Sequence, residues 1–423
     1  SDMSAEEFRD AVAGLSPEER EHWESPTTLI RRSGEAKLTA VPYHSAYADR
    51  LGEVFDGLEE AADILEDEGE EVLADYLRTR AEALVSGSYR EADSEWVGLT
   101  AVPLEVVIGP YEVYSDALLG RKAMYEAMLL VVDEERCGRL KEVEQNLGVL
   151  ADGFPLPAGS KPAVGGIAPM IVAHEIYGAG EAAQPIYPAA FNLPNDPRVR
   201  GNVGWKQVML YNVMQAKFDH VTSVIARRIL ADTAGVSFEP YFYHVLLHEV
   251  SHGLGPAYRA DGRSVDNSLG PHYTILEEAK ADTGGLHLLL QHGGSAGIPE
   301  FTDEQVLGSY TAALFRSMRF GLKEAHGAAN VIEHNWMLDR GVIERGRDGY
   351  IVQPGAAGEA VEALLMELCR LQAEASEEEA GEFISRWAVP DQELSNTIGA
   401  LSDLPIDLFF EFDPLLSGEA ADK

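Results

Sequence analysis

The sequence predicts an α+β protein that is predominantly helical and large enough for two lobes. Three observations carry this prediction. The chain has 423 residues, more than a single hydrophobic core usually serves. Apolar residues recur at helical spacing in several long segments. Glycine and proline are concentrated in the middle of the chain, which predicts loops and short strands there rather than further helices.

The pattern can be followed element by element. Residues 43–86 predict paired amphipathic helices, because apolar side chains form one stripe on the first of them: Leu51, Val54, Phe55, Leu58, Ala62 and Leu65. The segment "LEVVIGPYEVY" at 104–114 begins like a strand and is interrupted at Gly109-Pro110. Further helices are predicted over residues 4–24, 117–150, 205–232, 238–253, 274–292, 303–339 and 357–388. Loops with short strands are predicted over 151–204, and an extended tail over the last thirty residues.

The charge of the chain excludes two classes of partner. Acidic residues number 71 against 33 basic ones, for a net charge of −38. Nucleic acid and anionic membrane surfaces both require a positive footprint, so neither is an expected partner. No apolar run approaches the length of a membrane span. No positively charged start followed by an apolar stretch indicates a signal peptide, so a cytoplasmic location is expected. The two cysteines, Cys137 and Cys369, are expected to be buried structural thiols rather than a disulfide framework or a metal site.

Residues 248–256 read "HEVSHGLGP" and predict a metal site. His248 and His252 are four residues apart, so both imidazoles project from one face of a helix. That spacing suits two ligands of a single Zn²⁺, and Glu249 lies beside the first ligand as a candidate general base. Gly253 follows the second histidine directly and is a typical helix end.

A third ligand is predicted in the segment "TILEEAKADTGGL", which also has a helical pattern. Glu278 and Asp282 are four residues apart and share a face, so one carboxylate can bind zinc while the other accepts the ring N–H of a ligand histidine. Glu277 projects about 100° away from Glu278 and cannot be equivalent to it. One Zn²⁺ per chain is expected, bound by His248, His252 and Glu278.

Several segments together resemble the dipeptidyl peptidase III family of zinc metallopeptidases. "HEVSH" and "EEAKAD" are similar to its two zinc-binding helices. The other resembling segments, in the same order as in the family, are "VIGPYEVYSDALLGRKAMYEA", "FNLPNDPRVR", "NVMQAKFDHV" and "RFGLKEAHG". The chain is similar to the peptidase-like domain fused to some plant Nudix hydrolases and to its bacterial relatives. The resemblance runs from about Pro26 to Phe412.

The resemblance implies a fold of two lobes with a cleft, and zinc on the helical lobe. The smaller mixed α/β lobe is expected to comprise 26–120, 156–204 and 389–415, and the helical catalytic lobe 121–155 and 205–388. Glu249 would be the general base, and His326 would help to stabilise the transition state. Glu277 and Asp282 would support the zinc ligands. The residues that would hold the amino end and backbone of a peptide are Glu105, Asn192 and Asn195.

The expected function is zinc-dependent hydrolysis of peptide or amide bonds, and the resemblance implies an exopeptidase that acts on short peptides. The better-known members have a six-residue H-E-x-x-G-H motif, whereas this chain has the shorter five-residue form. It also has Val107 in place of a tyrosine and Asn330 in place of an arginine. These departures leave open a zinc hydrolase of a non-peptide amide or small metabolite. A third alternative is a zinc-stabilised binding protein without turnover, against which Glu249 argues because a structural site needs no base. The sequence makes no prediction of oligomeric state.

Overall fold

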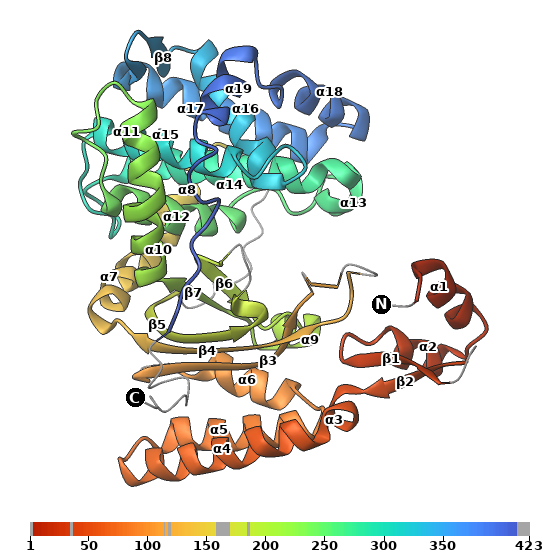
Figure 1. Ribbon diagram of the computed structural model, residues 1–423. Helices are drawn as coiled ribbons and strands as arrows, with labels where there is room; N and C mark the ends of the chain where they lie inside the picture. The colour runs from red at the N-terminus through yellow and green to blue at the C-terminus, as the bar shows by residue number, and fades with distance from the viewer. Residues whose placement is uncertain are drawn as a thin grey trace. The chain divides into compact units, whose positions relative to one another are not determined.

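The computed structural model describes residues 3–33, 37–100, 102–113, 115–116, 120–157, 170–183 and 187–412 (Figure 1). The chain forms two compact units. Unit 1 comprises Ser1–Glu134, Ala168–Leu210 and Phe409–Lys423, and unit 2 comprises Glu135–Ile167 and Tyr211–Leu408. The boundaries differ from those expected. Residues 121–134 belong to unit 1 rather than to the helical lobe, and residues 389–408 belong to unit 2.

Unit 1 contains a mixed sheet of five strands. The strands are β3 (Leu104–Glu112), β4 (Met124–Val132), β5 (Met170–Gly180), β6 (Ala190–Leu193) and β7 (Lys206–Leu210). Their order is β3-β4-β5-β7-β6; β5 and β7 are parallel, and the other neighbouring pairs are antiparallel. The pairing of β3 with β4 shifts register between Pro110 and Glu112, close to the expected interruption.

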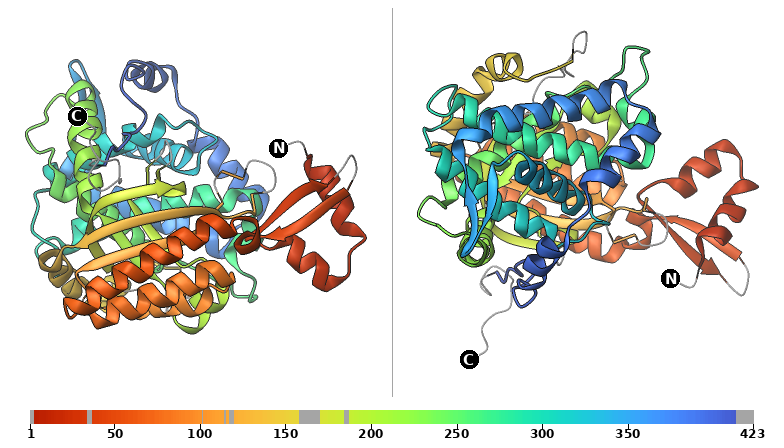
Figure 2. Two further views of the ribbon diagram at one scale, coloured as in Figure 1. Left: turned by 60° about the horizontal axis from the view of Figure 1, so that its bottom comes forward. Right: turned by 90° about the horizontal axis from the view of Figure 1, so that it is seen from above.

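Helices accompany this sheet in unit 1. The expected amphipathic pair is confirmed as α4 (Ala48–Asp67) and α5 (Glu71–Ser86), which lie side by side in Figure 2. Leu51, Leu58 and Ala62 of the predicted stripe are buried, whereas Val54 is exposed. The remaining elements are α1 (Ala5–Ala13), α2 (Pro17–Glu24), β1 (Thr28–Ser33), β2 (Lys37–Pro42), α3 (Tyr43–Ala46), α6 (Arg90–Gly98), η1 (Glu181–Ala183) and α9 (Pro197–Asn202).

Unit 2 is built almost entirely of helices. Those that carry the candidate site are α12 (Phe238–His252), α14 (Tyr273–His292), α16 (Ala325–Asp339) and α17 (Pro354–Glu374). A buried apolar cluster holds α14, α16 and α17 together, and its members include Leu276, Ala279, Ala328, Ala329, Ile332, Leu364, Leu368 and Leu371. The other elements are α7 (Glu134–Gln145), α8 (Leu147–Asp152), α10 (Tyr211–Lys217), η2 (Phe218–Thr222), α11 (Ser223–Ile229), α13 (Val265–Leu269), η3 (Gly270–His272), α15 (Asp303–Met318), β8 (Ile343–Gly346), β9 (Gly349–Val352), α18 (Glu377–Trp387) and α19 (Gln392–Gly399).

The structure confirms a predominantly helical α+β chain and corrects three local expectations. Within 117–150, the sequence "MYEAMLLVV" forms strand β4 rather than helix. Its Met, Glu, Ala and Leu residues favour helix intrinsically, but pairing with β3 and β5 overrides that weak preference. Strand β7 likewise replaces the start of the helix expected from residue 205, and α19 extends into the start of the expected tail. Across the described ranges, no helix is both long and apolar enough to cross a bilayer.

Candidate metal centre

Helix α12 presents the two predicted histidines on one face. The helix ends at His252, and the backbone N–H of Gly253 caps its last turn by donating to carbonyl groups of that turn. His248 is buried, whereas the His252 side chain is 32% exposed. His248 is thus held by the protein interior, while His252 lies at the edge from which a solvent-borne ligand can arrive.

Two glycines allow α14 to pack closely against α12. A Cβ atom added at Gly285 would lie 2.7 Å from the backbone nitrogen of His248, and one added at Gly284 would lie 2.7 Å from Ser251 Oγ. Contacts under 3.0 Å require the structure to move. The absence of side chains at these two positions therefore lets the carboxylates of α14 reach the imidazoles of α12.

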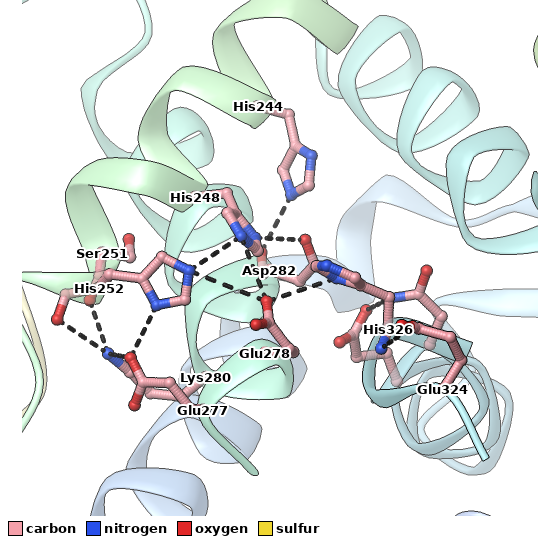
Figure 3. A network of polar contacts seen from close by, with 12 residues as sticks. His244, His248, Ser251, His252, Glu277, Glu278, Lys280, Asp282, Glu324 and His326 are labelled. Carbon is pink, nitrogen blue, oxygen red and sulfur yellow. Dashed lines mark hydrogen bonds and ion pairs between the residues drawn. The ribbon is translucent and has the colours of Figure 1, made fainter. Parts of the chain in front are cut away.

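Three side-chain atoms converge where these helices meet (Figure 3). His248 Nε2 lies 3.1 Å from His252 Nε2 and 3.5 Å from Glu278 Oε2, and His252 Nε2 lies 3.8 Å from the same carboxylate oxygen. Tetrahedral ligands held at about 2.0–2.1 Å from a zinc ion would be about 3.3–3.4 Å apart. The triangle formed by these two Nε2 atoms and Glu278 Oε2 therefore has the size that one such ion requires.

The Glu278 carboxylate provides a second indication of a cation. Its Oε2 atom is buried, and within the described part of the chain it accepts no hydrogen bond. A buried polar atom without a partner is costly, and coordination of a metal ion would satisfy it. Two imidazole nitrogens and one carboxylate oxygen form a donor set typical of catalytic zinc. The residues present therefore fit a metal ion, and three protein ligands leave one position open.

Each histidine is oriented by a carboxylate of α14. His248 Nδ1 donates to Asp282 Oδ1 at 2.6 Å, and His252 Nδ1 donates to Glu277 Oε1 at 2.8 Å. A histidine whose Nδ1 carries the proton presents the lone pair of Nε2 to the metal. Both Nε2 atoms accordingly face the triangle, and Asp282 occupies the role expected for the carboxylate that shares a face with Glu278.

The electrostatics of the His248 arm favour a cation at the site. Burial lowers the pKa of His248, but Asp282, Glu249 and Glu278 outweigh burial and raise it to about 10. Burial raises the pKa of Asp282, but the charge of His248 and its hydrogen bond to Asp282 lower this pKa by more, so it lies well below its usual range. These carboxylates create a strongly negative environment that either protons or a metal ion can neutralise.

The His252 arm contains a buried lysine. Lys280 Nζ lies 2.7 Å from Glu277 Oε1 and donates to the carbonyl oxygen of Ser251 at 2.8 Å. Burial raises the pKa of Glu277, but Lys280 and His252 lower it to about 2, so this carboxylate is ionised. Lys280 thereby ties the end of α12 to α14.

Glu249 and His326 lie beside the triangle. Glu249 follows His248 on α12, is partly exposed, and acts electrostatically on His248. His326 is near the start of α16, and its Nδ1 lies 3.4 Å from Glu278 Oε2. Its side chain is 45% exposed, and it is not among the three residues whose ligand atoms converge. Glu249 thus acts on one of the three ligand residues and His326 lies near another.

The residues expected to hold a peptide's amino end all belong to unit 1. Asn192 lies in β6 opposite Gln207, and Asn195 donates to Glu112 Oε1 at 3.1 Å. Glu105 differs from the expectation of a substrate-facing carboxylate. It is 1% exposed, and its Oε1 accepts a hydrogen bond from the buried Lys206 at 2.7 Å. Its partner is already part of the protein, which does not support a role in binding a substrate ammonium group.

Residues that sequence reasoning missed complete the site. Lys280 lies inside the quoted "EEAKAD" segment, but nothing in its spacing distinguished it from a solvent-exposed lysine. Asn330 donates to Asp282 Oδ2, and Gln372 donates to Glu277 Oε2, each at 2.7 Å. Asn330 was noted only as a departure from an arginine, whereas the structure buries it against Asp282. No local signal marks Gln372.

Known proteins resemble this chain over most of its length. The solved structure of dipeptidyl peptidase III from Caldithrix abyssi superimposes with a TM-score of 0.93 at 33% identity, covering 99% of this chain and 80% of that one. That of dipeptidyl-peptidase III from Corallococcus sp. strain EGB has a TM-score of 0.79 at 32% identity and covers 99% and 78%.

Curated relatives are longer than this chain. Nudix hydrolase 3 of Arabidopsis thaliana is 30% identical over 96% of this chain and 56% of its own length. Dipeptidyl peptidase 3 of Nematostella vectensis is 26% identical over 59% of this chain and 39% of its own length. The chain thus spans about half the length or less of these relatives.

The family model for peptidase family M49 matches residues 4–268, which include the paired histidines of α12. This match agrees with the resemblance inferred from the motifs and with the similarity to the two solved structures. Because the match to the family model spans more than half of the residues of this chain, the chain belongs to peptidase family M49.

Proposed function

We propose that this chain is a zinc-dependent dipeptidyl peptidase acting on short peptides. The observation that carries the proposal is the triangle of His248, His252 and Glu278, with Glu249 beside it on the same helix. Three protein ligands and an adjacent carboxylate suit hydrolysis, whereas a structural zinc site closes with four protein ligands. The dipeptidyl-peptidase structures that superimpose on the chain support the choice of substrate class.

The chain's own residues account for the proton transfers. A bound zinc ion would polarise the scissile carbonyl and lower the pKa of water at the site. Glu249 takes the proton of the attacking water and passes it to the leaving amine. His326, at the exposed side of Glu278, donates a hydrogen bond to the carbonyl oxygen as negative charge develops on it. Asp282 and Glu277 keep the two histidines in the tautomer that leaves Nε2 free for the metal.

Recognition of the peptide's amino end is proposed for Asn192 and Asn195. Their carboxamide oxygens can accept hydrogen bonds from the ammonium group and the peptide N–H groups of a substrate. Asn195 Nδ2 already donates to the carbonyl of Tyr111 and to Glu112 Oε1, so the proposal for Asn195 concerns its oxygen. Glu105 was the third expected member of this group. Its burial with Lys206 makes an internal ion pair the better explanation of its charge.

The general base provides the first test. Glu249→Gln should retain the fold and the zinc, because Glu249 is not one of the three ligands. It should lose about 10²–10⁴-fold in kcat on any peptide that the parent cleaves. Turnover at the parental rate contradicts the mechanism, and loss of zinc would place Glu249 among the ligands. Zinc content by elemental analysis separates the two results.

A set of peptide pairs tests the substrate class. Each pair has the same sequence with a free or an acetylated amino end, and products of the zinc-loaded protein are identified by mass spectrometry. Free peptides should be cleaved after the second residue, and acetylated peptides at least about tenfold more slowly, since losing a hydrogen bond to a charged group costs about 1.5–3 kcal/mol. Equal rates would remove the exopeptidase assignment. Absence of any cleavage would favour a non-peptide amide substrate.

A further inference from the structure

Both carboxylates that orient the metal-site histidines have a second oxygen, and each of these oxygens is held by a side-chain amide. Asp282 Oδ2 accepts from Asn330 Nδ2 of α16 at 2.7 Å. Glu277 Oε2 accepts from Gln372 Nε2 of α17 at 2.7 Å. The two arms thus repeat one arrangement, although the amides come from different helices.

We propose that Asn330 and Gln372 are positioning residues of the metal site, whose amides hold the carboxylates that orient its histidines. We refer to the two residues as the carboxamide clamp. The inference rests on the proposed metal site and deepens it. It assigns a role to two residues that are not among the three whose ligand atoms converge.

The burial of the clamp supports a specific role. Asn330 is 3% exposed and Gln372 is fully buried. Asn330 is fixed in turn by Glu333, whose Oε2 lies 3.2 Å from Asn330 Nδ2 and accepts from Tyr310 O–H at 2.6 Å. Because both neighbours of Asn330 Nδ2 are carboxyl oxygens, the amide must present its nitrogen rather than its oxygen to Asp282.

The choice of a neutral donor has an electrostatic consequence. An amide holds a carboxylate oxygen by a hydrogen bond without adding a positive charge. Asp282 therefore keeps its full negative charge for His248, and within the described residues no lysine or arginine pairs with it. A carboxylate with both oxygens held cannot rotate about its Cβ–Cγ bond without breaking a hydrogen bond. The ring plane of His248, and the direction of its Nε2, are fixed as a result.

The two arms are not equivalent. Glu277 Oε1 is shared between His252 Nδ1 and the ammonium group of Lys280, whereas Asp282 Oδ1 accepts from His248. The positive charge of Lys280 weakens the effect of Glu277 on its histidine. The clamp on the His248 arm should therefore matter more for metal binding than the clamp on the His252 arm.

The test compares zinc affinity in Asn330→Leu with that in a matched control. Leucine is close to asparagine in shape but cannot donate. The control is Asn335→Leu on the same helix. Among the described residues, Asn335 Nδ2 donates to the carbonyls of Trp387 and Val389 and its Oδ1 contacts His334 Nδ1, and none of these groups holds a ligand of the metal site. Asn330→Leu should bind zinc about 10–100-fold more weakly, the range typical of groups that support metal ligands. Asn335→Leu should bind zinc within about twofold of the parent, since its carbonyl partners do not support the ligands.

Replacing the donor by an acceptor distinguishes positioning from core packing. Asn330→Asp keeps the size of the side chain but places a carboxylate against Asp282, and it should weaken zinc binding at least as much as Asn330→Leu. The absorption bands of the cobalt-substituted proteins report ligand geometry directly, and should shift in Asn330→Leu but not in Asn335→Leu.

Each outcome decides the proposal. Parental zinc affinity in folded Asn330→Leu overturns it, and so does parental zinc affinity in folded Asn330→Asp. If Asn330→Leu does not fold, Gln372→Leu carries the same prediction for His252 with a smaller expected loss. A parent that binds zinc but cleaves no peptide removes the proposed function and leaves the clamp standing. A parent that binds no zinc overturns both.

Discussion

Replacing Glu277 by glutamine should separate two effects that this carboxylate has on unit 2. Its Oε1 atom meets His252 Nδ1 at 2.8 Å and the ammonium nitrogen of Lys280 at 2.7 Å. Glu277→Gln keeps the shape of the side chain and removes its charge. We expect both the stability of the metal-free protein and its affinity for zinc to fall, for different physical reasons.

The stability effect comes from Lys280. This side chain is 1% exposed, so the substitution leaves a buried ammonium group with the carbonyl of Ser251, 2.8 Å away, as its close partner. Breaking a buried pair by removing one member costs about 3–5 kcal/mol. Because the Ser251 carbonyl remains, we expect the lower end, about 3 kcal/mol.

The affinity effect comes from His252. Loss of a carboxylate that supports a histidine ligand typically weakens metal binding by about 10–100-fold. This corresponds to about 1.4–2.7 kcal/mol. Glu278→Gln should weaken zinc binding far more, because Glu278 supplies a ligand atom and Glu277 does not.

Adding Lys280→Met to Glu277→Gln makes the test decisive. The double variant removes the buried charge, so its metal-free stability should return toward that of the parent while its zinc affinity stays low. Denaturant unfolding followed by far-UV circular dichroism measures the first quantity, and competition with a chromophoric chelator measures the second. Full recovery of zinc affinity in the double variant would refute the reasoning, since Glu277 would then act only through the fold. Equal zinc loss in Glu277→Gln and Glu278→Gln would make Glu277 a ligand.

Three further predictions concern other parts of the chain. His248→Ala combined with His252→Ala should abolish zinc binding, and elemental analysis that finds one zinc per chain in this variant would contradict the site. Gly285→Ala should destabilise unit 2 by about 1–3 kcal/mol and weaken zinc binding, because the new Cβ would meet the His248 backbone at 2.7 Å; thermal unfolding and chelator competition check both, and unchanged values would mean that α12 and α14 are not as close as described. In unit 1, burial and then Glu112 and Glu181 raise the pKa of Glu126 from 4.5 to about 8. The unfolded chain therefore loses this proton at lower pH than the folded chain, and the free energy of unfolding falls as pH rises from about 4.5 to about 8. Glu126→Gln should flatten that slope in urea titrations at pH 5 and pH 8, and an unchanged slope would show that Glu126 ionises normally.

Much of the candidate metal site was accessible from the sequence because its spacing is local. His248 and His252 are one helical turn apart, and so are Glu278 and Asp282, so each pair shares a face on any regular helix. The structure brings together the three predicted ligand residues and places Asp282 against His248. The helical character of α12 and α14 was likewise predictable, since their apolar positions recur at helical spacing and Gly253 follows α12 directly.

Long-range contacts decided the remainder. Asn330 and Asp282 are 48 residues apart in sequence, and Gln372 and Glu277 are 95 residues apart. Lys206, which donates a hydrogen bond to the Glu105 carboxylate, is 101 residues away from Glu105 in the sequence. The local pattern predicts helix for the residues of strand β4, because their side chains favour helix, and pairing with the strands on both sides makes them extended. Local periodicity determines which side chains share a face of one element. The partners of a buried amide, lysine or carboxylate depend on which elements pack together, which no local pattern encodes.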